Sequence, residues 1–319
     1  MNPPLSNQVR ADDQQAQALL AAKGKSFYWA SQLLGAAHAR RAARLYRFCR
    51  YLDDLVDEAA SADAAQASLN NVKAALVAGK SDDALVEDAL SLIKECSISP
   101  DAVIELINGV NSDLETVRIA DEAALLRYCY RVAGTVGIMM CAVLDVRNAA
   151  ALPYAIDLGI AMQITNICRD VAEDAAMGRI YLPASLIGEI NPDDLILPTR
   201  EVAAKVEQAL TILLSLAESF YASGMAGLSF LPLGARSGIA VASQIYREIG
   251  LKLKRAGYVY WKNRTVVSNG PKAVITVSSL VSNVVTPAFW RVVAPHDVNL
   301  HKALQGLPFA HVAERPLNG

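Results

Sequence analysis

The sequence has few of the residues that most often carry chemistry on their own, and neither sign of charge dominates it. Four histidines and five cysteines occur in 319 residues, aromatic residues make up 6%, and 30 Lys and Arg nearly balance 32 Asp and Glu. A nucleic-acid-binding face requires a local excess of basic residues. We therefore expect no nucleic-acid partner.

The cysteines are too scattered to share a structural role. The five are Cys49, Cys96, Cys129, Cys141 and Cys168. No two of them form a CxxC pair, which argues against a zinc site and against a disulfide framework. The N-terminal stretch MNPPLSNQVRADDQQAQ also lacks the basic and then apolar layout of a signal peptide. These features favour a reducing compartment, and we expect the protein in the cytoplasm.

The histidines lie where acid–base catalysis is not expected. His296, His301 and His311 belong to a tail without helical periodicity, and His38 stands among alanines and arginines. We predict that these side chains are solvated and that the chemistry does not depend on histidine.

Signals for β-strands and turns are also scarce. The chain has only 18 Gly and 13 Pro, and between them run segments of roughly 15 to 30 residues with helical spacing of apolar positions. Ser99 followed by Pro100 is typical of a helix start. We predict an all-α protein, one domain over residues 1–319 with helices around a central cavity, and poor order in residues 1–20 and 296–319.

One uncharged run, AVITVSSLVSNVVTPAFW at residues 273–290, approaches the length of a membrane span. Ser, Thr, Asn and Pro interrupt it, so we predict a buried core helix and leave open a contact with a membrane surface. The shorter run VAGTVGIMMCAVL, at residues 132–144, is predicted to be buried as well.

Acidic residues cluster in the stretch YRFCRYLDDLVDE, at residues 46–58. Asp53 and Asp57 are four residues apart, so a helix projects both carboxylates from one face, and Asp54 and Glu58 repeat the spacing. Like charges at this spacing destabilise an isolated helix by about 0.2–0.5 kcal/mol. Such a cluster alone is usually a solvated surface.

A second acidic cluster makes a solvated surface less attractive as an explanation. In QITNICRDVAEDAAMGRIYLP, at residues 163–183, Gln163, Asn166, Asp170 and Asp174 fall on one helical stripe. The stripe follows an apolar helix, where an uncompensated carboxylate is costly unless a cation accompanies it.

Two such clusters on facing helices would form an all-oxygen site suited to Mg²⁺. Calcium fits less well, because no looped series of ligands with a central glycine is present. Arg50, Arg169 and Arg179 accompany the clusters. These arginines either form salt bridges with the acids or hold diphosphate oxygens.

The motifs with their flanks resemble the squalene/phytoene synthase family of head-to-head prenyltransferases, and most closely its bacterial phytoene synthases. The likeness extends over roughly residues 20 to 265 in the order of the family. Five stretches carry it: KSF (25–27), YRFCRYLDDLVD (46–57), RYCYRVAGTVG (127–137), QITNICRDVAEDAAMGRIYLP (163–183) and ARSGIAVASQIYREIG (235–250).

This resemblance implies an isoprenoid-synthase-type helical bundle and assigns roles to particular residues. The metal ligands, for Mg²⁺ or alternatively Mn²⁺, would be Asp53, Asp57, Asn166, Asp170 and Asp174. The four aspartates and Tyr128 would be catalytic. Substrate-binding positions would be Ser26, Phe27, Tyr46, Arg50, Gln163, Asn166, Arg179, Tyr181, Tyr246 and Arg264. Gly109 and Asp113 also match, whereas Asn108 stands where the family usually has an acidic residue.

The implied reaction joins two geranylgeranyl diphosphates through a cyclopropyl-carbinyl diphosphate, prephytoene diphosphate, to 15-cis-phytoene for carotenoid synthesis, without a nicotinamide cofactor. Downstream carotenoid enzymes and peripheral contact with the inner membrane face are further expectations. The same motifs are compatible with squalene, presqualene or dehydrosqualene formation from farnesyl diphosphate, and with a non-catalytic binding or assembly factor. The metal boxes alone would also permit a cyclising terpene synthase.

Overall fold

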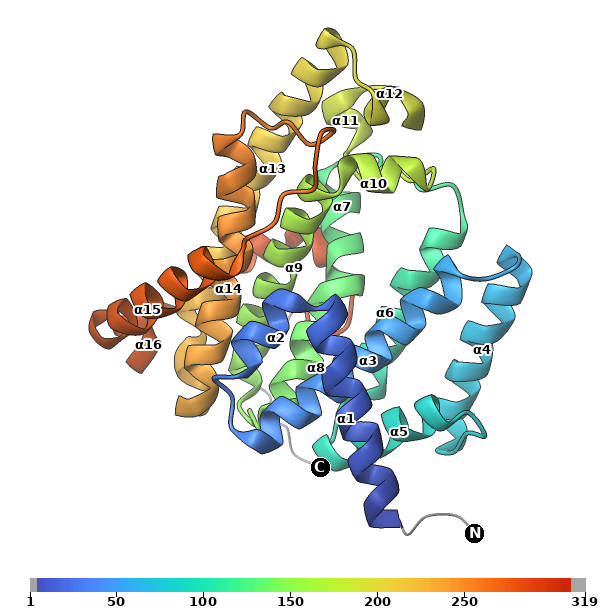
Figure 1. Ribbon diagram of the computed structural model, residues 1–319, viewed down its shortest axis with the longest axis vertical. Helices are drawn as coiled ribbons and strands as arrows, with labels where there is room; N and C mark the ends of the chain where they lie inside the picture. Colours follow the sequence, from blue (N-terminus) through green and yellow to red (C-terminus); the bar gives the residue numbers. More distant parts are fainter. Residues whose placement is uncertain (1–4, 311–319) are drawn as a thin grey trace.

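A computed structural model describes residues 5–310 of the chain, which fold into helices joined by short loops (Figure 1). Within this part the only β structure is an isolated bridge between Arg118 and Ile180. The α-helices are α1 (Leu5–Lys23), α2 (Lys25–Ser31), α3 (Ala36–Asp57), α4 (Ala62–Ala78), α5 (Ala84–Cys96), α6 (Pro100–Asn111), α7 (Glu122–Cys129), α8 (Thr135–Val143), α9 (Leu152–Arg169), α10 (Val171–Ala176), α11 (Ala184–Ile187), α12 (Pro192–Ile196), α13 (Arg200–Ala226), α14 (Leu233–Arg255), α15 (Asn269–Val285) and α16 (Pro287–Trp290).

Short segments of other helix types connect several of these helices. A π-helix, η2 (Tyr130–Gly134), joins α7 to α8, and 3₁₀-helices are η1 (Ser112–Leu114), η3 (Ala149–Ala151), η4 (Leu228–Phe230) and η5 (Val298–Leu304). The helix start predicted at Ser99 and Pro100 is confirmed, although the Ser99 side chain makes no capping hydrogen bond.

Helix α9 lies at the centre of the molecule and packs against α8, α13, α14 and η2. Ile156, Ile160 and Ile164 are completely buried along it. Two glycines allow the neighbouring backbones to approach closely: a Cβ on Gly137 would lie 2.2 Å from the Ala155 carbonyl oxygen, and one on Gly159 would lie 2.3 Å from that of Ala133. The packing of α8 and η2 on α9 is therefore closer than any larger residue would permit.

Helix α13 is the one described helix that is long and apolar enough, over Arg200–Phe230, to cross a membrane. Length and composition are the whole of that evidence, and the core helix of a globular domain meets the same criteria. The buried residues of α13, among them Leu210, Leu213 and Phe220, pack in the main core beside α9.

The burial predicted for residues 273–290 is wrong. These residues form α15 and α16, which project from one side of the molecule (Figure 1). The residues that α15 buries are Lys272, Ser279 and Asn283, whereas Val277 and Val281 are exposed. Apolar composition indicated a buried helix, but the polar stripe of this helix is the one that faces the protein.

The prediction of solvated histidines is wrong for the C-terminal segment. Segment 296–310 lies against α7 and α9, and His301 within it is only 1% exposed. The Nε2 atoms of His296 and His301 each lie 2.7 Å from one carboxylate oxygen of Asp157, a fully buried residue of α9. The Ser223 hydroxyl donates a third hydrogen bond to Asp157, at 2.5 Å. His311 lies outside the described residues.

The hydrogen bonds of His301 determine its protonation. Its Nδ1 lies 2.8 Å from the carbonyl oxygen of Ala310, and its Nε2 faces Asp157, so both ring nitrogens face acceptors and both must carry a proton. Burial opposes that charge, but the interactions with Asp157 outweigh it and raise the pKa of His301. A buried ion pair therefore fastens the C-terminal segment to α9.

Candidate active site

The first acidic cluster lies on the last turns of α3. Tyr46, Arg50, Asp53 and Asp57 succeed one another at helical spacing, so one face of α3 presents them all. Leu45, Phe48, Leu52 and Val56 are buried on the opposite side. The burial of that apolar stripe fixes the direction in which the carboxylates point.

The second acidic cluster lies where α9 ends and α10 begins. Asp170 interrupts the helix, because its φ of −104° and ψ of 17° depart from helical values. The hydrogen bond from the Asp174 amide to the Asp170 carbonyl, at 2.8 Å, nevertheless keeps one-turn spacing between these residues. The predicted stripe of Gln163, Asn166, Asp170 and Asp174 thus continues across a break that the spacing did not reveal.

Arginines join the two clusters. The Arg179 guanidinium, from the loop after α10, donates to Asp57 at 2.9 Å, and Arg264, from the loop before α15, donates to both oxygens of Asp170 at 2.8 and 2.9 Å. Arg169 also pairs with Asp170. Carboxylates predicted from two separate stretches of the sequence therefore share one site, and the cations around them are suited to diphosphate oxygens.

Asp113, in η1, lies between the two clusters. The Tyr128 hydroxyl donates to its Oδ2 at 3.0 Å, and the ring of Tyr128 lies 4.9 Å from that of Tyr181. The sequence indicated Asp113 only through the family likeness of NGVNSDL. Its central position could not be read from spacing, because η1 is remote in sequence from both clusters.

The site holds more negative charge than its arginines offset. Burial raises the pKa of Asp53 to about 7, with Asp57 and Asp113 adding repulsion against the attraction of Arg50. Burial and repulsion from Asp170 and Glu173 raise the pKa of Asp174 to about 8.

The other carboxyls of the site differ in how their arginines compensate them. Burial raises the pKa of Asp113 to about 6. Burial also opposes the charge of Asp170, but hydrogen bonds from Arg169 and Arg264 outweigh it and lower the pKa of that carboxyl.

The donor set suits a hard divalent cation. Buried oxygens of Asp113 and Asn166 have no hydrogen-bond partner among the described residues. An unpaired buried oxygen is costly, and so is a buried carboxylate whose pKa is raised toward neutrality. A dication bound by oxygens would relieve both costs, so the residues present fit the predicted metal.

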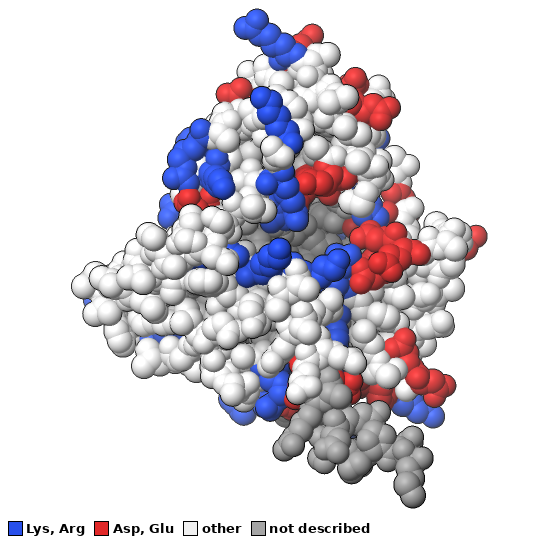
Figure 2. Space-filling model, in the orientation of Figure 1, with Lys and Arg blue, Asp and Glu red and all other residues white. Residues whose placement is uncertain are grey.

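A cavity of about 310 Å³ begins beside this site and extends into the helices. Gln163 and Asn166 line it near the carboxylates, and Tyr154, Gly227 and Leu228 line it farther along. The rest of the lining is almost entirely apolar. Figure 2 shows a hollow near the centre of one face, with basic and acidic side chains around its rim.

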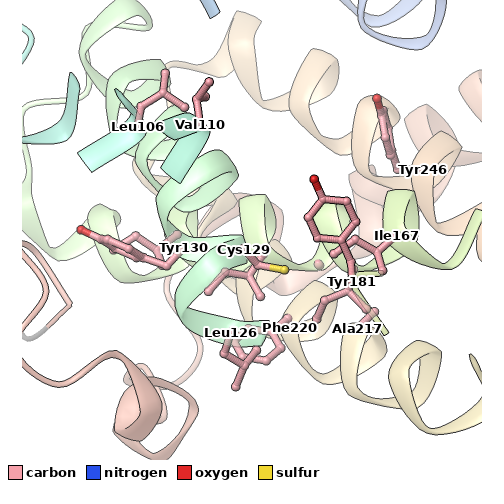
Figure 3. Close-up of a cluster of buried hydrophobic side chains, with 14 of the residues drawn as sticks. Leu106, Val110, Leu126, Cys129, Tyr130, Ile167, Tyr181, Ala217, Phe220 and Tyr246 are labelled. Carbon is pink, nitrogen blue, oxygen red and sulfur yellow. The ribbon is translucent and has the colours of Figure 1, made fainter. Parts of the chain in front are cut away.

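Aromatic residues predicted for the substrate site gather around the same region. The ring of Phe27 lies 4.9 Å from that of Tyr246 and 6.4 Å from that of Tyr46, and Ser26 precedes it in α2. In Figure 3 the hydroxyls of Tyr181 and Tyr246 point the same way, away from Phe220 and Leu126. The apolar parts of both rings pack in the core.

Sequence reasoning missed the wall that residues 130–143 give to the cavity. The run VAGTVGIMMCAVL was predicted only to be buried, whereas Val132, Val136 and Met140 line the cavity from η2 and α8. The π-helix at Tyr130–Gly134 is a type often found at functional sites, but no residue pattern predicts it.

The comparison with known proteins agrees with the fold and the site. The sequence matches the squalene/phytoene synthase family over residues 20–270, and the chain belongs to this family. It is 34% identical to a phytoene synthase of Pseudescherichia vulneris over 278 residues, which are 83% of this chain and 89% of that protein. It is 33% identical to the 15-cis-phytoene synthase of Pantoea ananas, covering 87% of this chain and 92% of that one.

The fold prediction is confirmed by similarity to solved structures. A crystal structure of a dehydrosqualene synthase in complex with ligand superposes with a TM-score of 0.75 at 28% identity, covering 88% of this chain and 99% of that one. Like that structure, the described part of this chain is built from helices, so the predicted all-α, isoprenoid-synthase-type bundle is confirmed.

Proposed function

We propose that this protein is a 15-cis-phytoene synthase, which condenses two geranylgeranyl diphosphates head to head through prephytoene diphosphate. The observation that carries the proposal is the pairing of two aspartate clusters, bridged by Arg179, at one end of an apolar cavity. Relatives that are named phytoene synthase and aligned over most of both chains support it.

Asp53, Asp57, Asn166, Asp170 and Asp174 would hold Mg²⁺, with Mn²⁺ as an alternative. When bound, this ion neutralises diphosphate so that it can leave an allylic carbon. Arg50, Arg179 and Arg264 would bind the diphosphate oxygens that the ion leaves free.

The residues around the cavity protect and position the cationic chain that remains. Its apolar lining excludes water, which would quench an allylic cation. The faces of Phe27 and Tyr128 stabilise passing positive charge without reacting with it. The remaining predicted substrate residues, Ser26, Tyr46, Gln163, Tyr181 and Tyr246, would orient the two chains at the same end.

The length of the cavity supports the twenty-carbon substrate over the fifteen-carbon one. The lining extends along α9 from Asn166 to Tyr154, twelve residues or about 18 Å of helix. An extended prenyl chain advances about 1.25 Å for each C–C bond of 1.52 Å, so geranylgeranyl spans about 19 Å and farnesyl about 14 Å.

A product assay tests the proposal. Purified protein is given Mg²⁺ and either farnesyl or geranylgeranyl diphosphate, with and without NADPH, and the organic extract is analysed by mass spectrometry. We expect a forty-carbon triene from geranylgeranyl diphosphate that does not require NADPH and disappears with EDTA. Asp170→Ala should abolish it, whereas Asp82→Ala, which removes an exposed acid from the loop between α4 and α5, should not.

Other products would redirect the assignment. A thirty-carbon product from farnesyl diphosphate alone would move the enzyme to the squalene branch with its chemistry unchanged. A folded protein that yields no product from either substrate would make the binding-factor alternative the better one.

We further propose that the enzyme works in the cytoplasm and touches a membrane peripherally, where its hydrocarbon product must go. The described cysteines are all free, which suits a reducing compartment. Later carotenoid enzymes would receive the product there.

A further inference from the structure

Helix α15 has the reverse of the usual polarity of a surface helix. Lys272, Thr276, Ser279 and Asn283 recur at helical spacing on the face toward the protein, and the Thr276 hydroxyl accepts a hydrogen bond of 2.9 Å from the Trp29 indole. The opposite face is an exposed stripe about 100° wide. It comprises Val274, Val277, Val281, Val284 and Val285, the last 80% exposed.

This stripe continues beyond the helix. Trp290, the last residue of α16, is exposed, and its indole N–H donates to the Val284 carbonyl oxygen at 2.9 Å. Val292 and Val293, which follow it, are exposed as well. Of the eighteen large hydrophobic residues that the described part exposes, nine fall between residues 274 and 293, including Leu280. We call this surface the valine ridge. In Figure 2 the projecting lobe, where Figure 1 places α15 and α16, is almost free of charge.

An exposed apolar surface of this size usually marks a site that binds another molecule or a membrane. Residues 273–290 contain no charged side chain, and Arg291, between Trp290 and Val292, is the one charge in the stretch that forms the valine ridge. Asn269, in the first turn, and Ser278 and Ser282 are the exposed polar residues along the helix. The ridge therefore offers a protein partner no acidic side chain and a single cation for ion pairing.

The charge around the ridge favours a lipid occupant of a particular kind. Residues 249–296 contain seven Lys and Arg and no Asp or Glu, but Arg255 and Arg264 pair with Glu248 and Asp170, and Lys272 is buried. Lys25 and Arg291, near the two ends of α15, are exposed cations. An apolar stripe edged by cations and a Trp is the pattern of an element that lies in the interface of an anionic bilayer.

The ridge is also close to the cavity. Helix α15 packs against α14, and the Lys272 ammonium donates to the Lys25 carbonyl oxygen at 3.3 Å at the start of α2. Phe27 and Ala30 from α2 and Ile239 and Ala242 from α14 line the cavity on their other side. A single layer of helices thus separates the ridge from the space in which the hydrocarbon would form.

We propose that the valine ridge docks this protein on the surface of an anionic lipid bilayer, with α15 lying in the plane of the interface. This deepens the peripheral membrane contact proposed above, but the docking is measured as binding and does not depend on turnover. A failure of the docking would therefore leave the proposed phytoene synthase activity standing, and a failure of the activity would leave the docking standing.

A flotation assay tests the docking. The full chain is mixed with vesicles of phosphatidylcholine and phosphatidylglycerol, or of phosphatidylcholine alone, and the floated fraction is measured at low and high salt. We expect flotation with the anionic vesicles that weakens with salt. The variant Val277→Asp/Val281→Asp should reduce the vesicle partition coefficient by at least about tenfold, because it places charge in the buried stripe.

A matched variant controls for charge and surface apolarity in general. Val77→Asp/Leu197→Asp also replaces two exposed aliphatic residues, which are 89% and 80% exposed on other elements, and should float as the wild type does. Thermal unfolding of each variant establishes that it is folded. The ridge has no role at the metal site, so activity on detergent-dispersed substrate should be unchanged.

Three results would overturn the inference: no flotation of the wild type with either vesicle, equal flotation of the two double variants, or a lipid-free dimer that only Val277→Asp/Val281→Asp dissociates. The dimer, measured by sedimentation velocity, would assign the ridge to a second copy of the chain.

Discussion

At the scale of single residues, the distinctive feature of the site is a carboxylate whose pKa is raised to near 7 by burial and by neighbouring acids. Burial, with repulsion from Asp57 and Asp113, brings the pKa of Asp53 to about 7. In the metal-free protein, ionised Asp53 therefore costs stability, although the proposed reaction requires it as a ligand.

Asp53→Asn should separate these two effects. We expect kcat/KM to fall by about 10³-fold or more, because a neutral amide is a weaker ligand than a carboxylate. The metal-free protein should meanwhile be as stable as the wild type or more so at pH 8, since a buried like charge has been removed. Steady-state kinetics and thermal unfolding check both. A loss of activity with a matching loss of stability would indicate a structural residue.

The pH dependence of metal-free stability follows from the same shifts. The folded pKa values of Asp53 and Asp174, about 7 and 8, lie above the ordinary value of 3.8. The folded state thus holds more protons than the unfolded one between about pH 4 and 8, and stability falls as pH rises through that window.

We expect the melting temperature in EDTA to fall by roughly 3–8 °C between pH 5 and pH 8. Mg²⁺ should remove most of this fall, because it binds the ionised folded form. Differential scanning calorimetry in matched buffers measures both curves. An unchanged slope with Mg²⁺ would contradict the assignment of these carboxylates to a metal.

At the scale of elements, the crossing of η2 and α9 depends on glycine. A methyl group at Gly159 would lie 2.3 Å from the Ala133 carbonyl oxygen, and Gly159 also lines the cavity. Gly159→Ala should lower the unfolding free energy by about 1–3 kcal/mol and narrow the cavity.

Gly270→Ala is the matched control, because Gly270 lies in the first turn of α15 with no atom within 4 Å of the added methyl. We expect it to be neutral or stabilising by about 0.5–1 kcal/mol. Urea titrations compare the two variants. Equal stability would contradict the close crossing.

The elements also show which information the sequence lacked. The DxxxD spacing in α3 and in α9–α10 predicted which side chains share a face, because that depends only on local helical geometry. The same reasoning failed for α15, where composition gave the helix but not the side that faces the protein. The ion pair of Asp57 with Arg179 joins residues 122 positions apart, and no local pattern encodes it.

At the scale of the whole molecule, the C-terminal segment is held by one buried charge pair and several polar anchors. Arg127 donates to the carbonyl oxygens of Ala303 and Gln305 at 3.0 Å each, and the Tyr154 hydroxyl donates to that of Ala294 at 3.0 Å. The sequence showed only a tail without periodicity, since its order depends on Asp157, which lies 144 positions from His301.

Asp157→Asn should lower the unfolding free energy by roughly 3–5 kcal/mol, because it leaves the His301 imidazolium without its carboxylate. The pKa of His301 is raised, so the wild-type pair stabilises fully below about pH 6.5 and is lost as pH rises through the folded value. The variant should lack this contribution.

Asp145→Asn offers the control, since Asp145 pairs with His38 at the surface, at 3.0 Å, and should cost less than about 1 kcal/mol. Urea unfolding at pH 6 and pH 8 measures both. The metal site should respond to neither, because Asp157 lies thirteen residues, or about 20 Å of helix, from Asp170. Similar costs in the two variants would contradict the ion pair.

The cavity along α9 gives the folded protein empty internal volume, and such volume makes the folding equilibrium sensitive to pressure. Unfolding removes internal void, so hydrostatic pressure favours the unfolded chain in proportion to the space that the fold keeps open. A space of about 310 Å³ should make the ligand-free protein easier to unfold by pressure than the same protein with that space filled. A prenyl chain occupying that space should restore its resistance, which makes pressure a direct gauge of how well a given chain length fills the cavity.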